Sequence, residues 1–289
     1  MTGKTINDNS TNWDVTIGPK GNNLSVDFKE LWRFRDLMMM FIKKDIITVY
    51  KQTVLGPVWF VIQPVFTTII YLLVFGRIAN IGTDGVPVIL FYMGSVTLWN
   101  YFSETMNVTS KTFIDHAFIF GKVYFPRIVV PISKVFSGLI KFFIQFALFF
   151  IAWLYYAVVK KTVSPNIYIL LFPVIVATLS LMSLGFGLFI TSMTTKYRDL
   201  VFLISFGVQL LMYATPIIYP LSKIAPKYQV WLWINPLTAL FETFKYGFFG
   251  KGGILSIPWL LYSIGFTLVL MTMGIIVFNK VEKRFIDTV

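Results

Sequence analysis

The chain has 289 residues, of which 56% are hydrophobic and 13% are charged, and its formal net charge is +12. Soluble domains carry about a quarter charged residues, and a soluble protein of this length could not cover so much apolar surface, so an ordinary water-soluble enzyme is excluded. The lack of cysteine excludes disulfides and thiolate nucleophiles, and the single histidine excludes a histidine-rich metal site. We therefore expect an all-α integral membrane protein whose basic residues flank its membrane spans.

The N-terminal 50 residues are polar or mixed in character and lack the apolar core of a secretory signal peptide, so we expect no cleaved leader. Residues 1–26 are expected to form a cytoplasmic segment, and residues 27–50 an amphipathic helix whose first residue, Asp27, is a suitable cap. One side of this helix is apolar and the other is mostly charged, which predicts a helix lying in the membrane interface. Arg35 and Asp45 interrupt the apolar side, either as snorkelling charges or as contacts with a charged substrate or partner.

Residues 51–289 are expected to form a membrane domain with six spans, because six apolar segments reach or approach the required length of about 20 residues. The predicted spans are residues 54–76, 88–109, 132–159, 167–193, 200–219 and 256–278. Lysine and arginine are more frequent before the first span, after the last span and in every second connection than in the alternate loops. This distribution predicts that both termini are cytoplasmic.

The connection between the fifth and sixth spans, residues 220–253, is too apolar for a free linker. Pro226 and Pro236 divide it. We therefore expect two short re-entrant helices that dip into the outer leaflet and form an outer gate.

Few side chains in this chain could perform acid–base chemistry. Only Glu104 and Glu242 are carboxylates expected at membrane depth, and His116 lies in a connection beside Asp115, where an ordinary loop role is the simpler interpretation. A proton-coupled carrier or a membrane enzyme would need more such groups. The sequence around Lys4 resembles only the tail of a nucleotide-binding loop, so a transport function would take its energy from another chain.

Three predicted spans carry aromatic side chains on one face, together with amides or hydroxyls. Helix packing is one explanation, but a lipid-facing glutamine is costly, and aromatic faces with amides suit sugar rings, which stack and form hydrogen bonds. The faces therefore predict a path for a sugar polymer. The expected lining is Trp59, Gln63 and Phe66 in the first span, Tyr92, Trp99 and Phe102 in the second, and Phe206, Gln209 and Tyr213 in the fifth.

Several segments, in the same order along the chain, resemble the permeases of the ABC-2 type that export polysaccharides, with the permeases of O-antigen and related lipopolysaccharide exporters the most similar. Capsule and teichoic acid exporters share this architecture. The resemblance runs from about residue 13 to residue 284. Its segments are LWRFRDL at 31–37, YKQTVLGPVW at 50–59, KVYFPR at 122–127, KYRD at 196–199, TPIIYP at 215–220 and INPL at 234–237.

The resemblance implies that this chain is half of a transporter and not an enzyme. Two copies would form the path, with two copies of a separate ATPase that binds ATP and Mg²⁺, and this chain would bind no cofactor or metal. The substrate would be an undecaprenyl-pyrophosphate-linked glycan that moves from cytoplasm to periplasm across the bacterial inner membrane. Nucleic acid is not expected as a partner.

Two further groups of residues follow from this arrangement. The connection 111–127 has apolar residues with no membrane to enter, which predicts burial against the ATPase. We expect contacts from Phe113, Phe118, Phe120, Tyr197, Arg198 and Asp199. The lipid pyrophosphate is expected to enter at Arg33, Arg35 and Lys51, on or just after the interface helix, since these side chains suit phosphate oxygens.

Two alternatives remain. An ABC-2 exporter of a drug or a simple lipid would need a more uniformly apolar path than the aromatic and amide faces provide. A membrane-embedded glycan-modifying enzyme would need an acid or base in a pocket, and only Glu104 and Glu242 are available.

Overall fold

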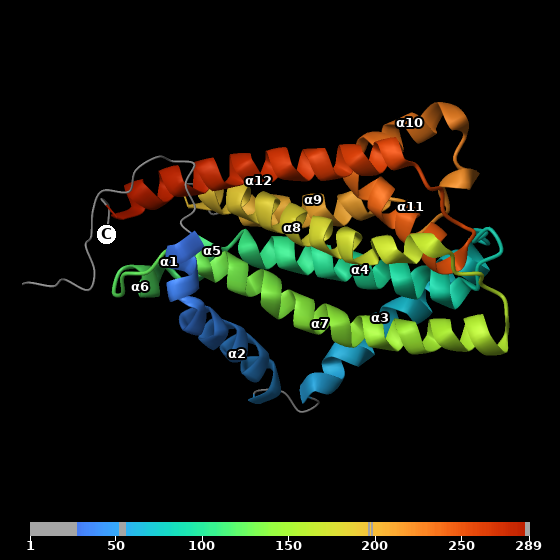
Figure 1. Cartoon of the computed structure of the whole chain (residues 1–289), viewed down its shortest axis with the longest axis horizontal. Helices are drawn as coiled ribbons and strands as arrows, with labels where there is room; N and C mark the ends of the chain where they lie inside the picture. Colours follow the sequence, from blue (N-terminus) through green and yellow to red (C-terminus); the bar gives the residue numbers. More distant parts are fainter. Residues whose placement is uncertain (1–27, 52–55, 196, 198, 287–289) are drawn as a thin grey trace, which may run out of the picture.

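The computed structural model describes residues 28–51, 56–195, 197 and 199–286. Within these ranges every regular element is a helix (Figure 1), as predicted. The α-helices are α1 (Phe28–Arg33), α2 (Arg35–Lys51), α3 (Trp59–Tyr71), α4 (Val88–Thr109), α5 (Thr112–Asp115), α6 (Ala117–Phe120), α7 (Val129–Leu154), α8 (Phe172–Thr194), α9 (Leu200–Tyr213), α10 (Pro226–Ile234), α11 (Pro236–Phe249) and α12 (Ile257–Ile286). Shorter 3-10 or π-helical segments are Gly56–Val58, Leu72–Ile78, Tyr155–Val159, Ile167–Leu171 and Leu221–Lys223.

Four of the described helical runs are long and apolar enough to cross a membrane, and they coincide with the first, third, fourth and sixth predicted spans. They are Trp59–Ile78, Val129–Val159, Ile167–Thr194 and Ile257–Glu282. α4 occupies the predicted second span and α9 part of the fifth. The count of six spans and the orientation of the termini stay predictions.

Helix α9 is shorter than the fifth span predicted from the sequence, because it ends at Tyr213 after 14 residues. At 1.5 Å per residue it covers about 21 Å, less than the roughly 30 Å of a hydrocarbon core. Pro216 explains the early end, since proline lacks a backbone N–H and its ring disfavours a helical conformation in the preceding residue.

Helix α4 lies at the centre of the bundle and packs against α3, α7, α8, α9 and α11 (Figure 1). All ten residues from 90 to 99 are buried. Small residues bring its neighbours close: a Cβ atom on Gly94 would lie 2.9 Å from the ring of Phe149 in α7, and one on Gly187 in α8 would overlap Thr109. This dependence on small residues is typical of helices that pack inside membranes.

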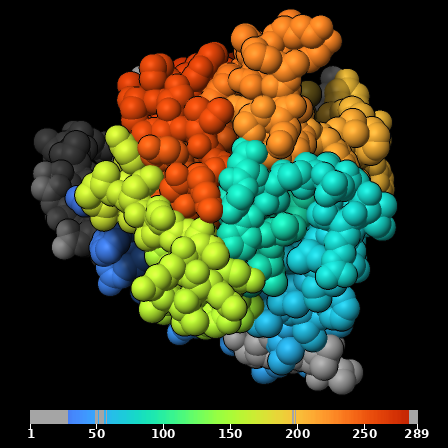
Figure 2. Space-filling view, turned by 90° about the vertical axis from the view of Figure 1, so that its right-hand side faces the viewer, coloured from blue at the N-terminus to red at the C-terminus, as the bar shows by residue number. Residues whose placement is uncertain are grey.

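The two ends of the bundle differ in what they hold (Figure 1). One end carries α5, α6 and the C-terminal part of α12, and is termed the α6 end. The opposite end carries α10 and α11 and is termed the α10 end. Figure 2 views the α10 end, where α10 (orange) lies at the rim beside the start of α12 (red) and the residues around the start of α4 (teal).

The predicted outer gate region contains two helices, α10 and α11, and each begins with a proline. Asn235 caps α11, because its side chain accepts a hydrogen bond from the backbone N–H of Leu237 at 3.1 Å. Its amide also donates to the Thr215 hydroxyl at 2.9 Å, which ties α11 to the end of α9. Gly250, with φ at 69°, ends α11 in the left-handed conformation that glycine favours. Whether these helices act as a gate stays a prediction.

The single helix predicted for residues 27–50 is present as α1 and α2, which are separated at Phe34. In Figure 1, α2 runs obliquely along the flank of α7 from the α6 end. Phe41 and Ile42 of α2 are buried, whereas Met39 and Met40 are exposed. The buried side of α2 therefore covers α7, and exposed apolar side chains remain on its outer side.

Candidate functional site

The acidic residue that interrupts the apolar side of α2 has a partner within the chain. The Asp45 carboxylate lies 2.6 Å from the Lys134 ammonium of α7, and it accepts a hydrogen bond from the Ser137 hydroxyl at 3.1 Å. The side chains of Asp45 and Lys134 are 21% and 14% exposed. Asp45 thus fixes α2 on α7.

A second ion pair lies further along α7. Lys141 pairs with Glu104 of α4. Lys134 and Lys141 are seven residues apart, which is two helical turns, so both point from one face of α7. The two pairs join α2 and α4 to the same helix.

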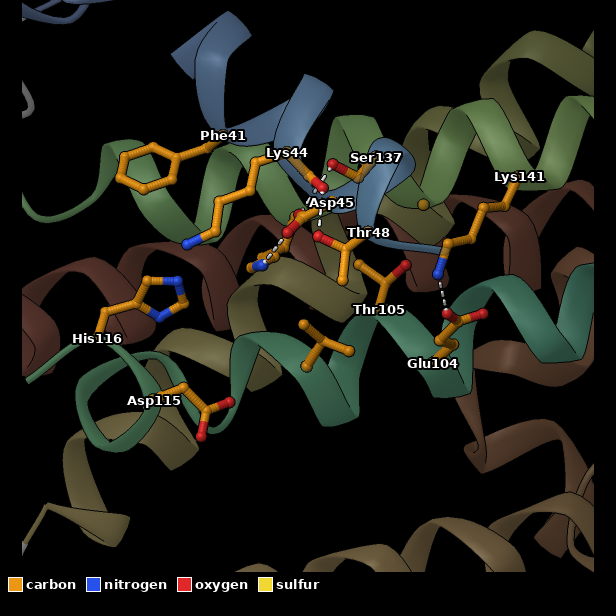
Figure 3. Close-up of a pocket in the computed structure, with 13 residues that line it drawn as sticks. Phe41, Lys44, Asp45, Thr48, Glu104, Thr105, Asp115, His116, Ser137 and Lys141 are labelled. Carbon is orange, nitrogen blue, oxygen red and sulfur yellow. Dashed lines mark hydrogen bonds and ion pairs between the residues drawn. The ribbon is translucent and has the colours of Figure 1, made fainter. Parts of the chain in front are cut away.

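Between these ion pairs lies a cavity of about 390 Å³, shown in Figure 3. Residues of α2, α4, α5 and α7 and the adjoining His116 line it, and most of them are polar or charged. In Figure 3, Lys44 and His116 lie toward one side of the cavity, and the Lys141–Glu104 pair lies at the other. Within the described ranges, no group of three or more His, Cys, Asp or Glu residues could hold a metal ion.

The His116 side chain is partly buried between neighbouring helices, although it lies in a connection. Its ring contacts Phe41 of α2 in an edge-on arrangement, with centroids 6.1 Å apart, and also lies near Phe120 of α6. Burial, and then the positive charge of Lys134, lower the pKa of His116, while Asp115 partly opposes this effect. The imidazole is therefore neutral at pH 7.

The aromatic residues predicted to contact an ATPase divide into two groups. Phe113 and Phe120 are buried, and Phe113 stacks on Phe278 of α12 at 4.9 Å. Phe118 is 73% exposed and lies under the Lys122 ammonium. Tyr197 and Asp199 are exposed as well, and Arg198 lies outside the described residues.

The residues predicted to meet a lipid pyrophosphate, Arg33, Arg35 and Lys51, are all exposed. The Arg35 guanidinium lies 5.4 Å from the centre of the Trp32 ring and 3.8 Å from the Asp36 carboxylate. Arg33 and Arg35 flank the break between α1 and α2, and Lys51 is the last residue of α2, so the three side chains form no single site within one chain.

The predicted path residues also divide into two groups. Those of α3 and α9, namely Trp59, Gln63, Phe66, Phe206, Gln209 and Tyr213, are all exposed. Tyr92, Trp99 and Phe102 of α4 are buried in the chain's own core. The residues of α4 are buried because other helices surround this helix on its sides. The periodicity of a single segment does not show which other helices pack around it.

Helices α3 and α9 meet near the α10 end. The Tyr71 hydroxyl of α3 donates a hydrogen bond to the Met212 sulfur of α9 at 3.4 Å. Two turns earlier in α9, the Ser205 hydroxyl donates a hydrogen bond to the Asn107 side-chain oxygen of α4 at 3.3 Å. The exposed aromatic and amide side chains of α3 and α9 thus belong to neighbouring helices that both pack on α4.

A fully buried ion pair at the α10 end was not predicted. The Lys245 ammonium lies 2.9 Å from the Glu242 carboxylate, and the two side chains are 0% and 1% exposed. Lys245 also donates to the Pro216 carbonyl and faces the Phe91 ring at 4.6 Å. The second oxygen of Glu242 accepts from the Ile254 backbone N–H at 2.9 Å. The three-residue spacing of acid and base on a helix was the sequence signal for this pair.

The comparison with protein families agrees with this multi-pass helical architecture. The chain belongs to the ABC-2 type transporter family, whose pattern matches residues 37–249. It is therefore a membrane-embedded transporter component, and a permease of this class implies an ATPase partner.

Individual relatives point in the same direction. The chain is 26% identical to an O-antigen export system permease protein, RfbA, of Klebsiella pneumoniae over 254 residues, which cover 87% of this chain and 94% of the relative. It is 25% identical to the protein of the same name from Myxococcus xanthus over 219 residues, which cover 75% of this chain and 82% of the relative.

Proposed function

We propose that this chain is the permease subunit of an ATP-driven exporter of an O-antigen-like polysaccharide. The observation that carries the proposal is the match to relatives named as O-antigen export permeases over most of both chains. Two copies of the chain and two copies of an ATPase form the exporter, and the ATPase binds ATP and Mg²⁺. The substrate is an undecaprenyl-pyrophosphate-linked glycan that moves from cytoplasm to periplasm across the inner membrane.

The membrane arrangement has six spans, formed by α3, α4, α7, α8, α9 and α12 with their short extensions. The α6 end is cytoplasmic, in agreement with the excess of lysine and arginine in the connections on that side. On this arrangement α10 and α11 lie at the periplasmic side, where they form the outer gate.

The glycan path is lined by the exposed faces of α3 and α9. Trp59 and Phe66 on α3 and Phe206 and Tyr213 on α9 offer ring faces outside the chain's own core, and Gln63 and Gln209 offer amides. Stacking on aromatic rings is weak and tolerant of sugar identity, which allows a polymer to slide. The buried residues Tyr92, Trp99 and Phe102 of α4 pack in the core beneath α3 and α9. They could contact the glycan directly only if α4 became exposed.

The cytoplasmic side holds the two remaining groups of functional residues. Arg33, Arg35 and Lys51 attract the pyrophosphate of the lipid carrier at the membrane surface. Phe118, together with Tyr197 and Asp199, contacts the ATPase, because these side chains are exposed on the same side as the α6 end.

Reconstitution of the chain with its ATPase in vesicles tests this function. ATP-dependent transfer of a lipid-linked polysaccharide is expected, and Tyr213→Ala should lower it several-fold without loss of folded protein. Tyr213→Phe should retain most of the transfer, because the ring remains. Trp99→Ala should mainly lower the free energy of unfolding, since Trp99 is only 5% exposed. Transfer of a simple lipid but not of a lipid-linked polysaccharide would contradict the proposal.

A further inference from the structure

The cavity between α2, α4 and α7 contains a polar group that the described residues leave unsatisfied (Figure 3). Thr105 is 3% exposed, and its hydroxyl oxygen has no hydrogen-bond partner in the described part of the chain. A buried hydroxyl without a partner is unfavourable, so this group is suited to a ligand that enters the cavity.

Glycine allows α7 to approach this hydroxyl closely. Gly138 of α7 lines the cavity, and a Cβ atom there would lie only 2.7 Å from the Thr105 hydroxyl oxygen. Any other residue at this position would crowd the hydroxyl. The cavity wall therefore contains a hydroxyl that is close to α7 but has no hydrogen-bond partner among the described residues.

The charges around the cavity balance. Lys44, Lys134 and Lys141 face Asp45, Glu104 and Asp115, and two lysines are already paired with two of the acids. The Lys44 ammonium and the Asp115 carboxylate form no ion pair or hydrogen bond with the described residues. The cavity thus offers one available positive group and one available negative group, which complements a zwitterion better than an anion.

The position of the cavity indicates where its occupant comes from. Its roof is α2, on which exposed Met39, Met40 and Ile47 alternate with exposed Lys43 and Lys44. A helix with this composition is suited to the headgroup layer of a membrane. Lipid headgroups are therefore present at high local concentration at the mouth of the cavity.

We propose that this cavity binds the phosphoethanolamine headgroup of a membrane phospholipid. The phosphate lies toward Lys44 and the Thr105 hydroxyl, and the primary ammonium lies toward Asp115, to which it donates a hydrogen bond. Phe41 is the one phenylalanine, tyrosine or tryptophan among the described residues of the lining, so the cavity lacks the aromatic cage that recognises quaternary ammonium groups such as choline. The proposal requires only that the chain lies in a membrane, and it does not depend on the transported substrate.

Native mass spectrometry of the full chain in detergent tests the proposal without ATPase or polymer. Phosphatidylethanolamine should bind at least about ten-fold more tightly than phosphatidylglycerol or phosphatidylcholine of the same acyl chains, a difference of about 1.4 kcal/mol. Soluble phosphoethanolamine should compete, and inorganic phosphate should compete poorly. Equal binding of the three lipids, or full competition by phosphate alone, would overturn the proposal.

Matched variants locate the site. Lys44→Gln and Thr105→Val should each weaken phosphatidylethanolamine binding about five- to ten-fold. Their controls are Lys43→Gln, an exposed neighbour outside the lining, and Thr97→Val, a buried threonine of α4 that is bonded to its own helix; both should bind as the wild type does. Equal losses at Lys43 and Lys44 would indicate general attraction to the membrane and refute the site. If Thr105→Val fails to fold, the two lysine variants decide the question.

Discussion

The ion pairs at the two ends of the bundle differ in burial and in the helices that they join. At the α10 end, Glu242 and Lys245 lie one turn apart on the same helix, and both are fully buried. Every oxygen of the acid and the ammonium of the base have partners there. At the α6 end, the pairs Asp45–Lys134 and Glu104–Lys141 join different helices and border an open cavity.

This difference indicates a structural role for the ion pair at the α10 end. A buried pair in a low-dielectric interior is costly to form and still more costly to break, because the remaining partner is left as an unpaired charge. The Glu242–Lys245 pair therefore fixes α11 to the turn at Pro216. The side chains of the pairs at the α6 end are partly exposed, so they can lose or exchange partners at a much smaller cost.

The strongest test removes the cation at the α10 end. Lys245→Met should lower the free energy of unfolding by about 3–5 kcal/mol, because Glu242 would remain buried without its partner. Unfolding in a denaturing detergent, followed by tryptophan fluorescence, measures this loss. Lys251→Met, at an exposed lysine of the same end, should change stability by less than about 0.5 kcal/mol. The double variant Glu242→Gln/Lys245→Met should lose less than the two single variants together, and simple additivity would contradict a coupled pair.

A second test separates buried from exposed aromatic residues at the α6 end. Phe120→Ser should cost about 3–5 kcal/mol of stability, because Phe120 belongs to the core formed with Phe113 and Phe125. Phe118→Ser should leave the free energy of unfolding within about 0.5 kcal/mol of the wild type and uncouple ATP hydrolysis from export. Unchanged export by a folded Phe118→Ser variant would refute the ATPase contact.

The pair between α2 and α7 should be weaker than the pair at the α10 end. Asp45→Asn keeps the size of the side chain but removes its charge, and we expect a loss of about 1 kcal/mol in the free energy of unfolding. Asp36→Asn is the control, since its side chain is 93% exposed and its loss should be close to zero. A loss at Asp45 as large as that at Lys245 would remove the distinction between the two ends.

The sequence predicted the helical class, the family and the positions of most long helices, because apolar runs of sufficient length have few alternatives in a membrane. It predicted the two helices of residues 220–253 as well, since Pro226 and Pro236 each mark a helix start. It failed at the end of α9, where the apolar run continues to Tyr219 but Pro216 stops the helix.

The relations between helices could not be read from the sequence. The aromatic faces of α3, α4 and α9 look alike in a helical projection, yet Trp99 is buried and Phe66 is exposed. Only the packing around α4 distinguishes them. Lys141 within the third span and Asp45 on an apolar face were visible as unusual charges, but their partners lie 37 and 89 residues away in the chain, so no local pattern could pair them.

The smallest expected effect concerns pH at the α6 end. Burial and Lys134 lower the pKa of His116 below its ordinary value of 6.5, so the folded state favours the neutral imidazole while the unfolded state protonates first. Stability should therefore fall as the pH drops through 6.5 toward the folded pKa, and it should be insensitive to His116 above pH 7.5. The groups that face His116 are Lys134, which strengthens this effect, and Asp115 and Asp45, which weaken it.

The variant His116→Gln tests this prediction, because glutamine does not titrate. As the pH drops from 7.5 to 5.5, the free energy of unfolding of the variant should rise relative to that of the wild type. Detergent unfolding at both pH values measures the difference. A parallel pH dependence in the two proteins would show that folding does not shift the pKa of His116, and it would contradict the prediction.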